Sequence, residues 1–282
     1  MNKKILYISF AVGLTIGITA ALLHVNEKET TLCILHTNDT HSRVEPLGQT
    51  ETSSGLGGYA RRIEFIKQQR KTENVLLLDA GDFMQGTPYF NIFKGEIEID
   101  AMNRMGYDAA TLGNHEFDNP VDTLAKYLKA ADFAVVVSNY NVKNSPLEDI
   151  VKPYHIVNKK GIKIGIVGAG VQLEGLVSMA NVGNVTYDDP IEPINKYAKM
   201  LKEEKDCDVV ICLSHLGYKY KSNMVSDIVL AQKTRNIDAI IGGHTHSLVV
   251  GEKIPNLDGD TVILSQMQKS GIYVGKMQMT FE

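Results

Sequence analysis

The sequence predicts an α/β domain in which strands and helices alternate along the chain. Short, continuous apolar runs, such as residues 75–78 and 237–241, are typical of strands that are covered on both faces of a sheet. Stretches with helical periodicity separate these runs, and residues 59–71 are the clearest of them. Several runs end directly in Gly, Asp, Asn or His. Because such sheets carry their chemistry outside the carboxyl ends of their strands, these polar ends are candidate functional residues.

The elements follow from these patterns in chain order. Strands are predicted at residues 32–37, 75–78, 108–112, 133–137, 208–213, 237–241, 261–264 and 271–281, with a hairpin at 154–157 and 162–167. Helices are predicted at 59–71, 96–105, 121–130, 191–205 and 227–233. Residues 49–58 are polar and rich in glycine, which indicates a loop. No repeat or internal linker divides the sequence after its N-terminus, so we expect one domain.

Two local patterns suggest phosphate or cofactor binding but favour a plainer interpretation. Arg61 and Arg62 are expected on the solvated face of the first helix rather than in a phosphate clamp. Gly168-Ala169-Gly170 resembles the start of a dinucleotide-binding turn, but Leu173 stands where the third glycine belongs. We therefore interpret this segment as the end of a strand.

Composition limits the classes of function. The 282 residues are 44% hydrophobic, which is enough for a sizeable core. The formal net charge of -4 argues against a polynucleotide as the substrate, because binding one requires a basic surface. This charge is still compatible with a small anionic substrate, provided that a bound metal ion attracts it. Cys207 and Cys212 bracket a predicted strand and lie roughly 16 Å apart on an extended chain, which is too far for a disulfide. Together with Cys33, they are expected to be buried thiols.

The N-terminus predicts export. Lys3 and Lys4 precede residues 5–23, which contain no charge, as in a signal peptide or a membrane anchor. Both interpretations stay open, although Thr19-Ala20-Ala21 offers a weak cleavage site. The two lysines favour a cytoplasmic N-terminus, so the remainder is expected to be periplasmic or extracellular and to touch the membrane only through this segment. The predicted organisation is a signal peptide or anchor at 1–24, a linker at 25–31 and one folded domain at 32–282, which carries all the candidate functional residues described below.

Histidines follow the apolar runs with unusual frequency. Five of the eight stand directly after a predicted strand, and they are His41, His115, His215, His244 and His246. Asp39, Asp82 and Asn114 accompany them at the same kind of position. The other three, His24, His36 and His155, do not share the pattern and are expected to be structural. A single histidine after a strand is usually an ordinary loop residue, but this repetition indicates a shared site.

The residue types at these positions favour a centre of two divalent metal ions. The set contains no thiolate, which argues against a cysteine-rich structural zinc site. Imidazole, carboxylate and amide oxygen together suit Zn, Mn, Fe or Co. Seven ligands are too many for one tetrahedral ion, and Asp82, in the middle of the set, has two oxygens with which to bridge a pair. Two ions clamp the attacking and leaving oxygens of an in-line displacement and activate water, which is the chemistry of phosphate-ester hydrolysis.

The ordered motifs resemble those of a known family. Asp39-Thr40-His41, Gly81-Asp82, Gly113-Asn114-His115-Glu116, His215 and Gly243-His244-Thr245-His246 are similar to the five blocks of the calcineurin-like metallophosphoesterases. The segments 37–42, 57–61, 81–88 and 115–118 further resemble the exported 5′-nucleotidase branch, which includes UDP-sugar hydrolases. The match covers about residues 31–282. It implies a four-layer α/β/β/α sandwich, in which helices flank two β-sheets.

The resemblance also implies a role for each site residue. Asp39, His41, Asp82 and His246 would hold the first ion, and Asp82, Asn114, His215 and His244 the second. His115 would lie beside the phosphoryl group, where it would stabilise developing charge or protonate the leaving oxygen. Asp118 would orient His115, because a carboxylate fixes an imidazole and favours its charged form. The implied activity is 5′-nucleotidase-like release of phosphate from nucleotides by metal-activated water.

Three other expectations accompany this interpretation. Members of this branch usually carry a C-terminal domain that binds the nucleoside, whereas this sequence ends at Glu282, so a separately encoded nucleoside-binding domain is a candidate partner. A phosphatase or cyclic phosphodiesterase for another small phosphoester is an alternative within enzymes. A non-catalytic, metal-containing binding subunit is the alternative from another class.

Overall fold

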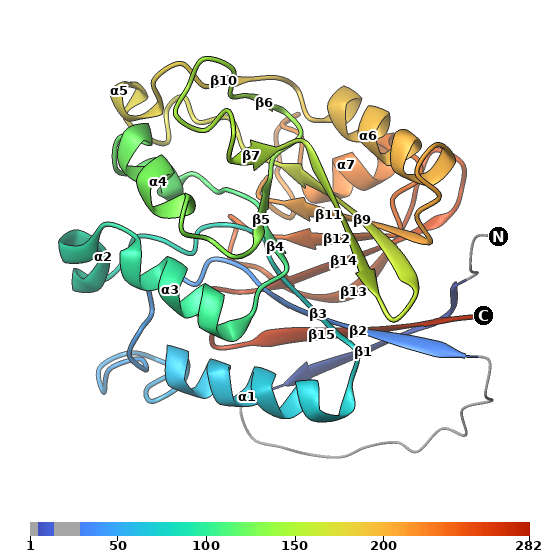
Figure 1. The fold of residues 1–282 in the computed structure, drawn as a ribbon, viewed down its shortest axis with the longest axis horizontal. Helices are drawn as coiled ribbons and strands as arrows, with labels where there is room; N and C mark the ends of the chain where they lie inside the picture. The colour runs from blue at the N-terminus through green and yellow to red at the C-terminus, as the bar shows by residue number, and fades with distance from the viewer. Residues whose placement is uncertain (1–4, 14–28) are drawn as a thin grey trace.

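Two stacked β-sheets with helices on both outer faces form the molecule (Figure 1). The computed structural model describes residues 5–13 and 29–282. Within these residues, the expected four-layer α/β/β/α sandwich is confirmed. The first sheet has the order β1-β15-β2-β3-β4-β5-β7, and the second has the order β13-β14-β12-β11-β9-β8.

The strands of the first sheet are β1 (Ile5–Gly13), β15 (Val274–Phe281), β2 (Thr30–Thr37), β3 (Val75–Asp79), β4 (Ala109–Ala110), β5 (Ala134–Val136) and β7 (Val151–Lys152). Those of the second are β13 (Leu248–Pro255), β14 (Thr261–Met267), β12 (Ala239–Gly242), β11 (Val209–Ser214), β9 (Ile162–Ala169) and β8 (Tyr154–Lys159). A separate antiparallel pair joins β6 (Tyr140–Asn141) to β10 (Thr186–Tyr187).

Helices of the first layer are α1 (Tyr59–Thr72), α2 (Pro88–Phe93), α3 (Glu96–Met105), α4 (Val121–Leu128) and α5 (Met179–Val182). The opposite layer consists of α6 (Ile191–Glu203) and α7 (Asp227–Lys233). One short 3-10 turn, His115–Phe117, follows β4. Several helices stop where the sequence suggests: α3 ends at Gly106, whose left-handed backbone (φ 72°) lets its N–H reach the carbonyl oxygens of Met102 and Asn103.

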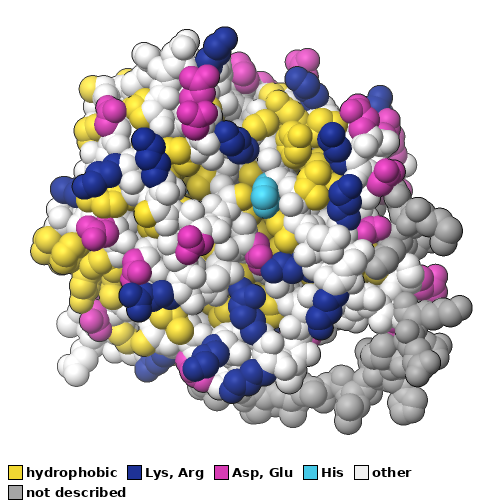
Figure 2. All heavy atoms as spheres, in the orientation of Figure 1, with side chains coloured by type: hydrophobic (Ala, Val, Ile, Leu, Met, Phe, Trp, Pro, Cys, Tyr) yellow, Lys and Arg dark blue, Asp and Glu magenta, His cyan; other side chains and the backbone are white. Residues whose placement is uncertain are grey.

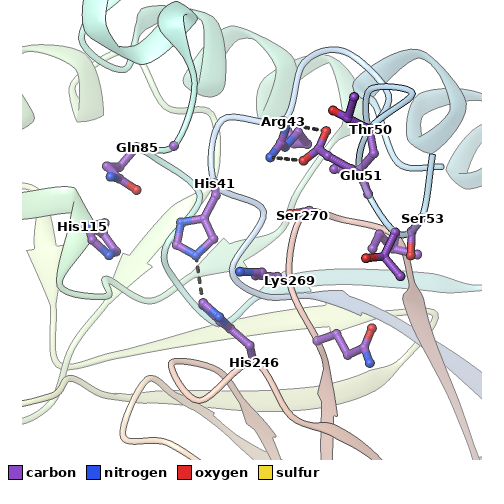
Figure 3. Close-up of a pocket in the computed structure, with 15 residues that line it drawn as sticks. His41, Arg43, Thr50, Glu51, Ser53, Gln85, His115, His246, Lys269 and Ser270 are labelled. Atoms are coloured by element: carbon purple, nitrogen blue, oxygen red, sulfur yellow. Dashed lines mark hydrogen bonds and ion pairs between the residues drawn. The ribbon is translucent and has the colours of Figure 1, made fainter. Parts of the chain in front are cut away.

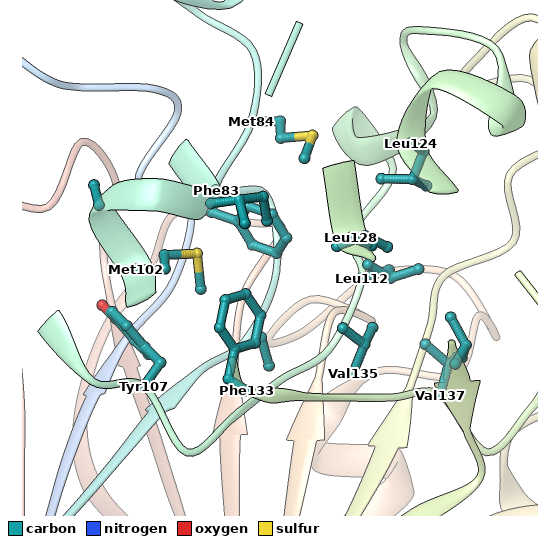
Figure 4. Packing of buried hydrophobic residues seen from close by; sticks show 14 of the residues in the cluster. Phe83, Met84, Met102, Tyr107, Leu112, Leu124, Leu128, Phe133, Val135 and Val137 are labelled. Atoms are coloured by element: carbon teal, nitrogen blue, oxygen red, sulfur yellow. The ribbon is translucent and has the colours of Figure 1, made fainter. Parts of the chain in front are cut away.

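Three apolar cores separate the four layers. Between the sheets, Leu76 and Leu78 of β3 belong to the same cluster as Ile164 of β9 and Ile211 of β11. A second core lies under the first helical layer, where Met102 of α3 and Leu124 and Leu128 of α4 surround Phe133 and Val135 (Figure 4). The third lies under α6 and α7. The continuous apolar runs of the sequence are thus explained by strands that are covered on both faces.

Parallel pairing brings the strand ends to one edge of the sandwich. In the first sheet, Thr37 of β2 is in register with Asp79 of β3, and Asp79 with Ala110 of β4. In the second, Ser214 of β11 is in register with Gly242 of β12. Each of these strands runs in the same direction as its partner. The loops that follow them therefore leave the two sheets from the same side.

Several local expectations need correction. β4 contains only Ala109 and Ala110 rather than residues 108–112, because the chain leaves the ladder early to form the next loop. Arg62 is 3% exposed, with its guanidinium carbon 5.3 Å from the ring centre of Tyr59, so only Arg61 of the pair is solvated. The sequence patterns also missed β13, where an irregularity between Val249 and Glu252 interrupts the alternation, and α2, which is too short to show helical periodicity.

The surface and the N-terminal segment complete the description. Acidic and basic side chains are interspersed over the face shown in Figure 2, without an extended basic area. The three cysteines are free and buried, as expected. Ile5–Gly13 pairs antiparallel with β15, and the rest of the predicted export segment, residues 14–23, lies outside the described residues. Among the described residues, no helix combines the length and apolar character that crossing a membrane requires.

Candidate metal centre and its pocket

Loops at one edge of the stacked sheets carry the predicted ligands. Asp39 and His41 follow β2, Asp82 follows β3, Asn114 follows β4, His215 follows β11, and His244 and His246 follow β12. These loops are joined to one another through their backbones: the N–H of Asp39 donates to the carbonyl of Gly81 at 2.9 Å, and that of His41 to the carbonyl of Asp82 at 3.0 Å. The side chains are thus positioned by contacts between loops.

Two groups of side chains converge in a geometry that suits metal ions. Asp39, His41 and His246 form the first group, and Asp82, His215 and His244 the second; within each, the ligand atoms lie within 4.8 Å of one another. The groups are adjacent, because His215 Nε2 lies 3.0 Å from Asp82 Oδ2 and 3.9 Å from Asp39 Oδ1. The resemblance implies that Asp39, His41 and His246 share one ion and that Asp82, His215 and His244 share another, and the structure brings the same residues together. It therefore offers two candidate His/Asp metal sites that are consistent with a dimetal centre.

Several polar side-chain atoms at these two candidate sites are arranged as cation ligands would be. The side-chain oxygen of Asn114 is buried and has no hydrogen-bond partner among the described residues. His41 Nε2 and His246 Nε2 point at each other from 3.0 Å, and His246 Nε2 lies 3.3 Å from Asp39 Oδ1. One divalent ion would give the nitrogens of His41 and His246 and the oxygen of Asp39 a common partner, and a second ion would do the same for the Asn114 oxygen in the other group; imidazole, carboxylate and amide oxygen are donors that suit such ions.

Backbone strain is concentrated in the same residues. Asp39 (φ 49°), His41 (47°), Asp82 (56°), His244 (70°) and His246 (52°) all adopt the left-handed conformation that non-glycine residues rarely use. Such conformations cost on the order of 1–3 kcal/mol each and persist where the surrounding structure fixes them. Five strained residues within one site indicate that the fold maintains this arrangement for a function.

Burial and charge hold His41, His244 and Asp82 in forms that can bind metal. Burial alone would lower the pKa of His215, but Asp82 and Asp39 outweigh burial and raise this pKa to about 10, so a bound ion would have to displace a proton from His215. Burial lowers the pKa of His41 and of His244 to about 4, which keeps both imidazoles neutral near pH 7. Burial alone would raise the pKa of Asp82, but His215, with which it is paired, outweighs burial and holds the pKa of this carboxyl well below its usual range. Neutral imidazoles and ionised carboxylates are the forms that bind metal.

His115 stands at the mouth of the centre. Its Nδ1 is 2.8 Å from Asp118 Oδ2, and its ring centre lies 5.4 Å from that of His41. Burial lowers the pKa of His115, but the hydrogen bond that His115 donates to Asp118 and the charge of Asp82 outweigh burial and raise this pKa above its ordinary value. The backbone N–H of His115 donates to Asp82 Oδ1 at 2.9 Å. One carboxylate therefore orients the imidazole of His115, and a second one holds the backbone of the same residue.

An open pocket of about 720 Å³ extends from this mouth. His41, His115 and His246 line its inner end, and Arg43 and Lys269 contribute cationic side chains to its wall (Figure 3). Half of its remaining lining comes from the loop between β2 and α1, and most of these loop residues are polar. The pocket is large enough for a substrate whose reacting end lies at the two groups.

Sequence reasoning missed three residues that shape this site. Glu116 accepts backbone N–H groups from both neighbouring loops, from Asp82 at 2.9 Å and from Gly113 at 2.6 Å. Asp227 is buried behind His215 and accepts a hydrogen bond from Ser214 Oγ at 2.5 Å. Lys269 reaches the pocket from the loop between β14 and β15. Glu116 at least lies in the quoted Gly-Asn-His-Glu motif, whereas no sequence pattern distinguishes the other two.

Close approach explains the glycine that precedes Asn114. A Cβ atom at Gly113 would overlap Asp82 Oδ1 and His215 Nε2. The backbone of this loop therefore passes directly beside two side chains of the second group. Only glycine permits this approach without moving them.

Comparison with known proteins agrees with this geometry. The model of the calcineurin-like phosphoesterase family matches residues 33–248. A snake venom 5′-nucleotidase from Naja atra is 35% identical over 89% of this chain and 50% of its own length, and a human 5′-nucleotidase is 34% identical over 89% and 46%. The crystal structure of a 5′-nucleotidase precursor from Thermus thermophilus superposes with a TM-score of 0.80 at 32% identity, over 88% of this chain and 51% of that one.

The chain spans about half the length of the curated relatives it matches. The family match, by contrast, covers most of this chain, residues 33–248. All seven candidate ligand positions, His115 and Asp118 lie within these bounds. The fold, the two His/Asp groups and this match lead to one conclusion: the chain belongs to the calcineurin-like phosphoesterase family.

Proposed function

We propose that this chain is a hydrolase of small phosphoesters that depends on two divalent metal ions and acts on nucleotides as a 5′-nucleotidase does. The observation that supports this most is the adjacency of the two groups, with Asp82 and Asp39 both within 4 Å of His215 Nε2. Zn, Mn, Fe and Co are the candidate metals, since the donors are nitrogen and oxygen. The named relatives are 5′-nucleotidases, which is why nucleotides are the first choice of substrate.

The residues take the following roles in this proposal. Asp39, His41, Asp82 and His246 hold one ion, while Asp82, Asn114, His215 and His244 hold the other. When bound, the ions lower the pKa of water and neutralise the phosphoryl oxygens. His115 remains outside the ligand set, and its ring faces the pocket (Figure 3). Held by Asp118, it stabilises charge on the phosphoryl group or donates a proton to the leaving oxygen.

A second candidate is a phosphatase or cyclic phosphodiesterase for another small phosphoester. The residues that line the pocket include no Phe, Tyr or Trp within the described part of the chain, so no such ring is there to stack on a nucleobase. Aromatic stacking is a common way to hold a base. A substrate without a base would therefore fit this pocket equally well.

The test compares metal content and hydrolysis in matched variants. Wild-type chain loaded with Mn²⁺ or Zn²⁺ is expected to bind two ions and to hydrolyse AMP faster than UDP-glucose, 2′,3′-cyclic AMP or an aryl phosphate. Asp82→Asn is expected to lose metal and activity together, whereas Asp149→Asn, an exposed carboxylate far along the chain, retains both. Full hydrolysis with unchanged metal in Asp82→Asn would refute the bridging role. Equal rates on all four substrates would favour the second candidate, and no hydrolysis at all would favour a non-catalytic subunit.

Export remains part of the proposal and rests on the sequence. The uncharged segment 5–23 after Lys3 and Lys4 supports a signal peptide or an anchor, and hence a periplasmic or extracellular location. Fractionation of cells that express the full chain, with N-terminal sequencing of the product, tests it. A cytoplasmic product that retains Met1 would contradict export.

A further inference from the structure

We propose that the pocket beside the metal centre binds a second anionic group of the substrate, a phosphate on the leaving-group side, and that Lys269 is the residue that selects it. This inference rests on the proposed function, because it concerns the part of a phosphoester that extends beyond the metal ligands. The substrates that it favours carry two phosphates joined to each other, as nucleoside diphosphates do.

The backbone of Lys269 is fixed by the same loops that carry the candidate ligands. On one side, the N–H of Ser270 donates to the carbonyl of Asp39 at 2.7 Å. On the other, the N–H of Gln268 donates to the carbonyl of Ser247 at 2.9 Å, next to His246. Asn38 adds a third tie, since its Nδ2 donates to the carbonyl of Gln268 at 2.6 Å. The backbone on both sides of Lys269 is therefore fixed between the β2 loop and the β12 loop, while the side chain of Lys269 is exposed.

The side chain of Lys269 extends into the pocket. Figure 3 shows it pointing from its loop toward His41 and His246, at the inner end of the cavity. Within residues 29–282, no hydrogen bond or ion pair joins its ammonium group to another residue. An unpaired cation that faces a substrate cavity is suited to an anion, which would gain a charge-assisted hydrogen bond there.

Of the two cationic side chains that the structure describes in the pocket wall, Lys269 has no acidic partner, whereas Arg43 is paired. Arg43 also lines the pocket, but its Nη2 lies 3.1 Å from Glu51 Oε1. Glu51 is further engaged by the N–H of Gly48, which donates to Oε2 at 2.7 Å. These contacts cancel the charge of Arg43 and fix the loop that forms the outer wall. Among the described residues, the pocket thus offers one free positive charge just outside the ligand groups, where a phosphate adjoining the reacting one would lie.

The experiment measures binding without hydrolysis. Metal-loaded full chain is titrated by calorimetry with methylphosphonate, which has one anionic group, and with methylenediphosphonate, which has two and resists hydrolysis. The wild type is expected to prefer the diphosphonate, and Lys269→Gln is expected to lose about tenfold of that preference, the lower range for a hydrogen bond to a charged group. Lys269→Arg keeps the charge and should keep the preference. Lys129→Gln, which removes an exposed lysine outside the pocket, serves as the control and should match the wild type.

The outcomes separate this inference from the proposed function. If Lys269→Gln weakens both ligands equally, Lys269 contacts the reacting phosphate and the second subsite is wrong. If it weakens neither, Lys269 has no part in binding and the inference also fails. Hydrolysis of nucleotides by the wild type is measured separately. A chain that discriminates between the two phosphonates but hydrolyses no phosphoester would retain the subsite and refute the proposed function.

Discussion

Glu116 accepts the backbone N–H of Asp82 at 2.9 Å and thereby fixes the loop that carries the proposed bridging carboxylate. The same carboxylate accepts the N–H of Gly113 at 2.6 Å and that of Met84 at 3.0 Å. One buried side chain thus joins the loop after β3 to the loop after β4. The positions of Asp82 and Asn114 relative to each other depend on it.

Substitution of Glu116 by Gln should weaken metal binding. In the variant, an amide NH₂ group, which is a donor, would replace one of the carboxylate oxygens that accept backbone N–H groups. At least one buried N–H donor would then lack an acceptor, which costs on the order of 1–3 kcal/mol. Loss of such a supporting contact usually reduces metal affinity or activity by about 10–100-fold. Equilibrium titration with Zn²⁺ or Mn²⁺ measures this.

Glu148→Gln is the matched control for that change. Glu148 is an exposed carboxylate that accepts a single backbone N–H, from Asn144 at 2.9 Å, far from the site in sequence. The metal affinity of the Glu148→Gln variant should equal that of the wild type. An unchanged affinity in Glu116→Gln as well would show that the three backbone contacts do not position the ligands.

Gly113→Ala should disturb the second group directly. The added Cβ would overlap Asp82 Oδ1 and His215 Nε2, so one of these side chains or the loop must move. We expect a loss of metal affinity of at least about tenfold, as for other changes that displace ligands. Gly48→Ala is the control, because the nearest atom to its Cβ is Glu51 Oε2 at 3.6 Å. If both variants bind two ions as the wild type does, the close approach is not required.

His115→Asn should separate metal binding from turnover. Since His115 is proposed to stand outside the ligand set, both ions should stay bound. The rate should fall by roughly 10²–10⁴-fold, the usual contribution of one positioned acid–base group. His155→Asn, at a half-buried histidine on β8, should change neither quantity. Metal loss in His115→Asn would mean that this residue is a ligand.

Strand ends made much of the fold and the centre predictable from sequence. A short apolar run closed by Gly or Asp marks both the strand and the place where its loop begins, as at residues 75–82. Parallel pairing then brings such ends together, so His41 and His246, 205 positions apart in the chain, come within 3.0 Å. This step needs only the direction of the strands, which the alternation of elements already suggests.

Contacts between loops could not be predicted in this way. Glu116 acts by accepting N–H groups that belong to other loops, and Lys269 is placed by carbonyl groups of Asp39 and Ser247. Neither role leaves a periodic pattern in the sequence, because each depends on how loops after different strands meet. Arg62 shows the same limit: its neighbours on α1 suggest a solvated face, but tertiary packing against Gly271, in the loop before β15, buries it.

His36 should make stability depend on pH outside the metal centre. It lies fully buried on β2 against Gly275, and burial lowers its pKa from 6.5 to about 4. Above pH 6.5 the folded and unfolded chains both hold it neutral, so it contributes no pH dependence there. As the pH falls from 6.5 toward 4, only the unfolded chain takes up the proton, and the folded state loses up to about 3 kcal/mol, since one pKa unit corresponds to ~1.4 kcal/mol.

Denaturant unfolding of the metal-free protein between pH 4 and pH 7.5 tests this contribution. Chelator is present throughout, so that loss of bound metal at low pH does not add to the slope. His36→Gln has no titrating group at this position, so its free energy of unfolding should fall less steeply between pH 6.5 and pH 4 than that of the wild type. Any fixed cost of repacking against Gly275 shifts the whole curve and leaves the slope unaffected. His155→Gln should change the slope less, because His155 is only partly buried and its pKa is lowered by burial but raised in part by Asp108. Parallel curves for wild type and His36→Gln would show that His36 titrates normally in the folded chain and is not buried in its neutral form.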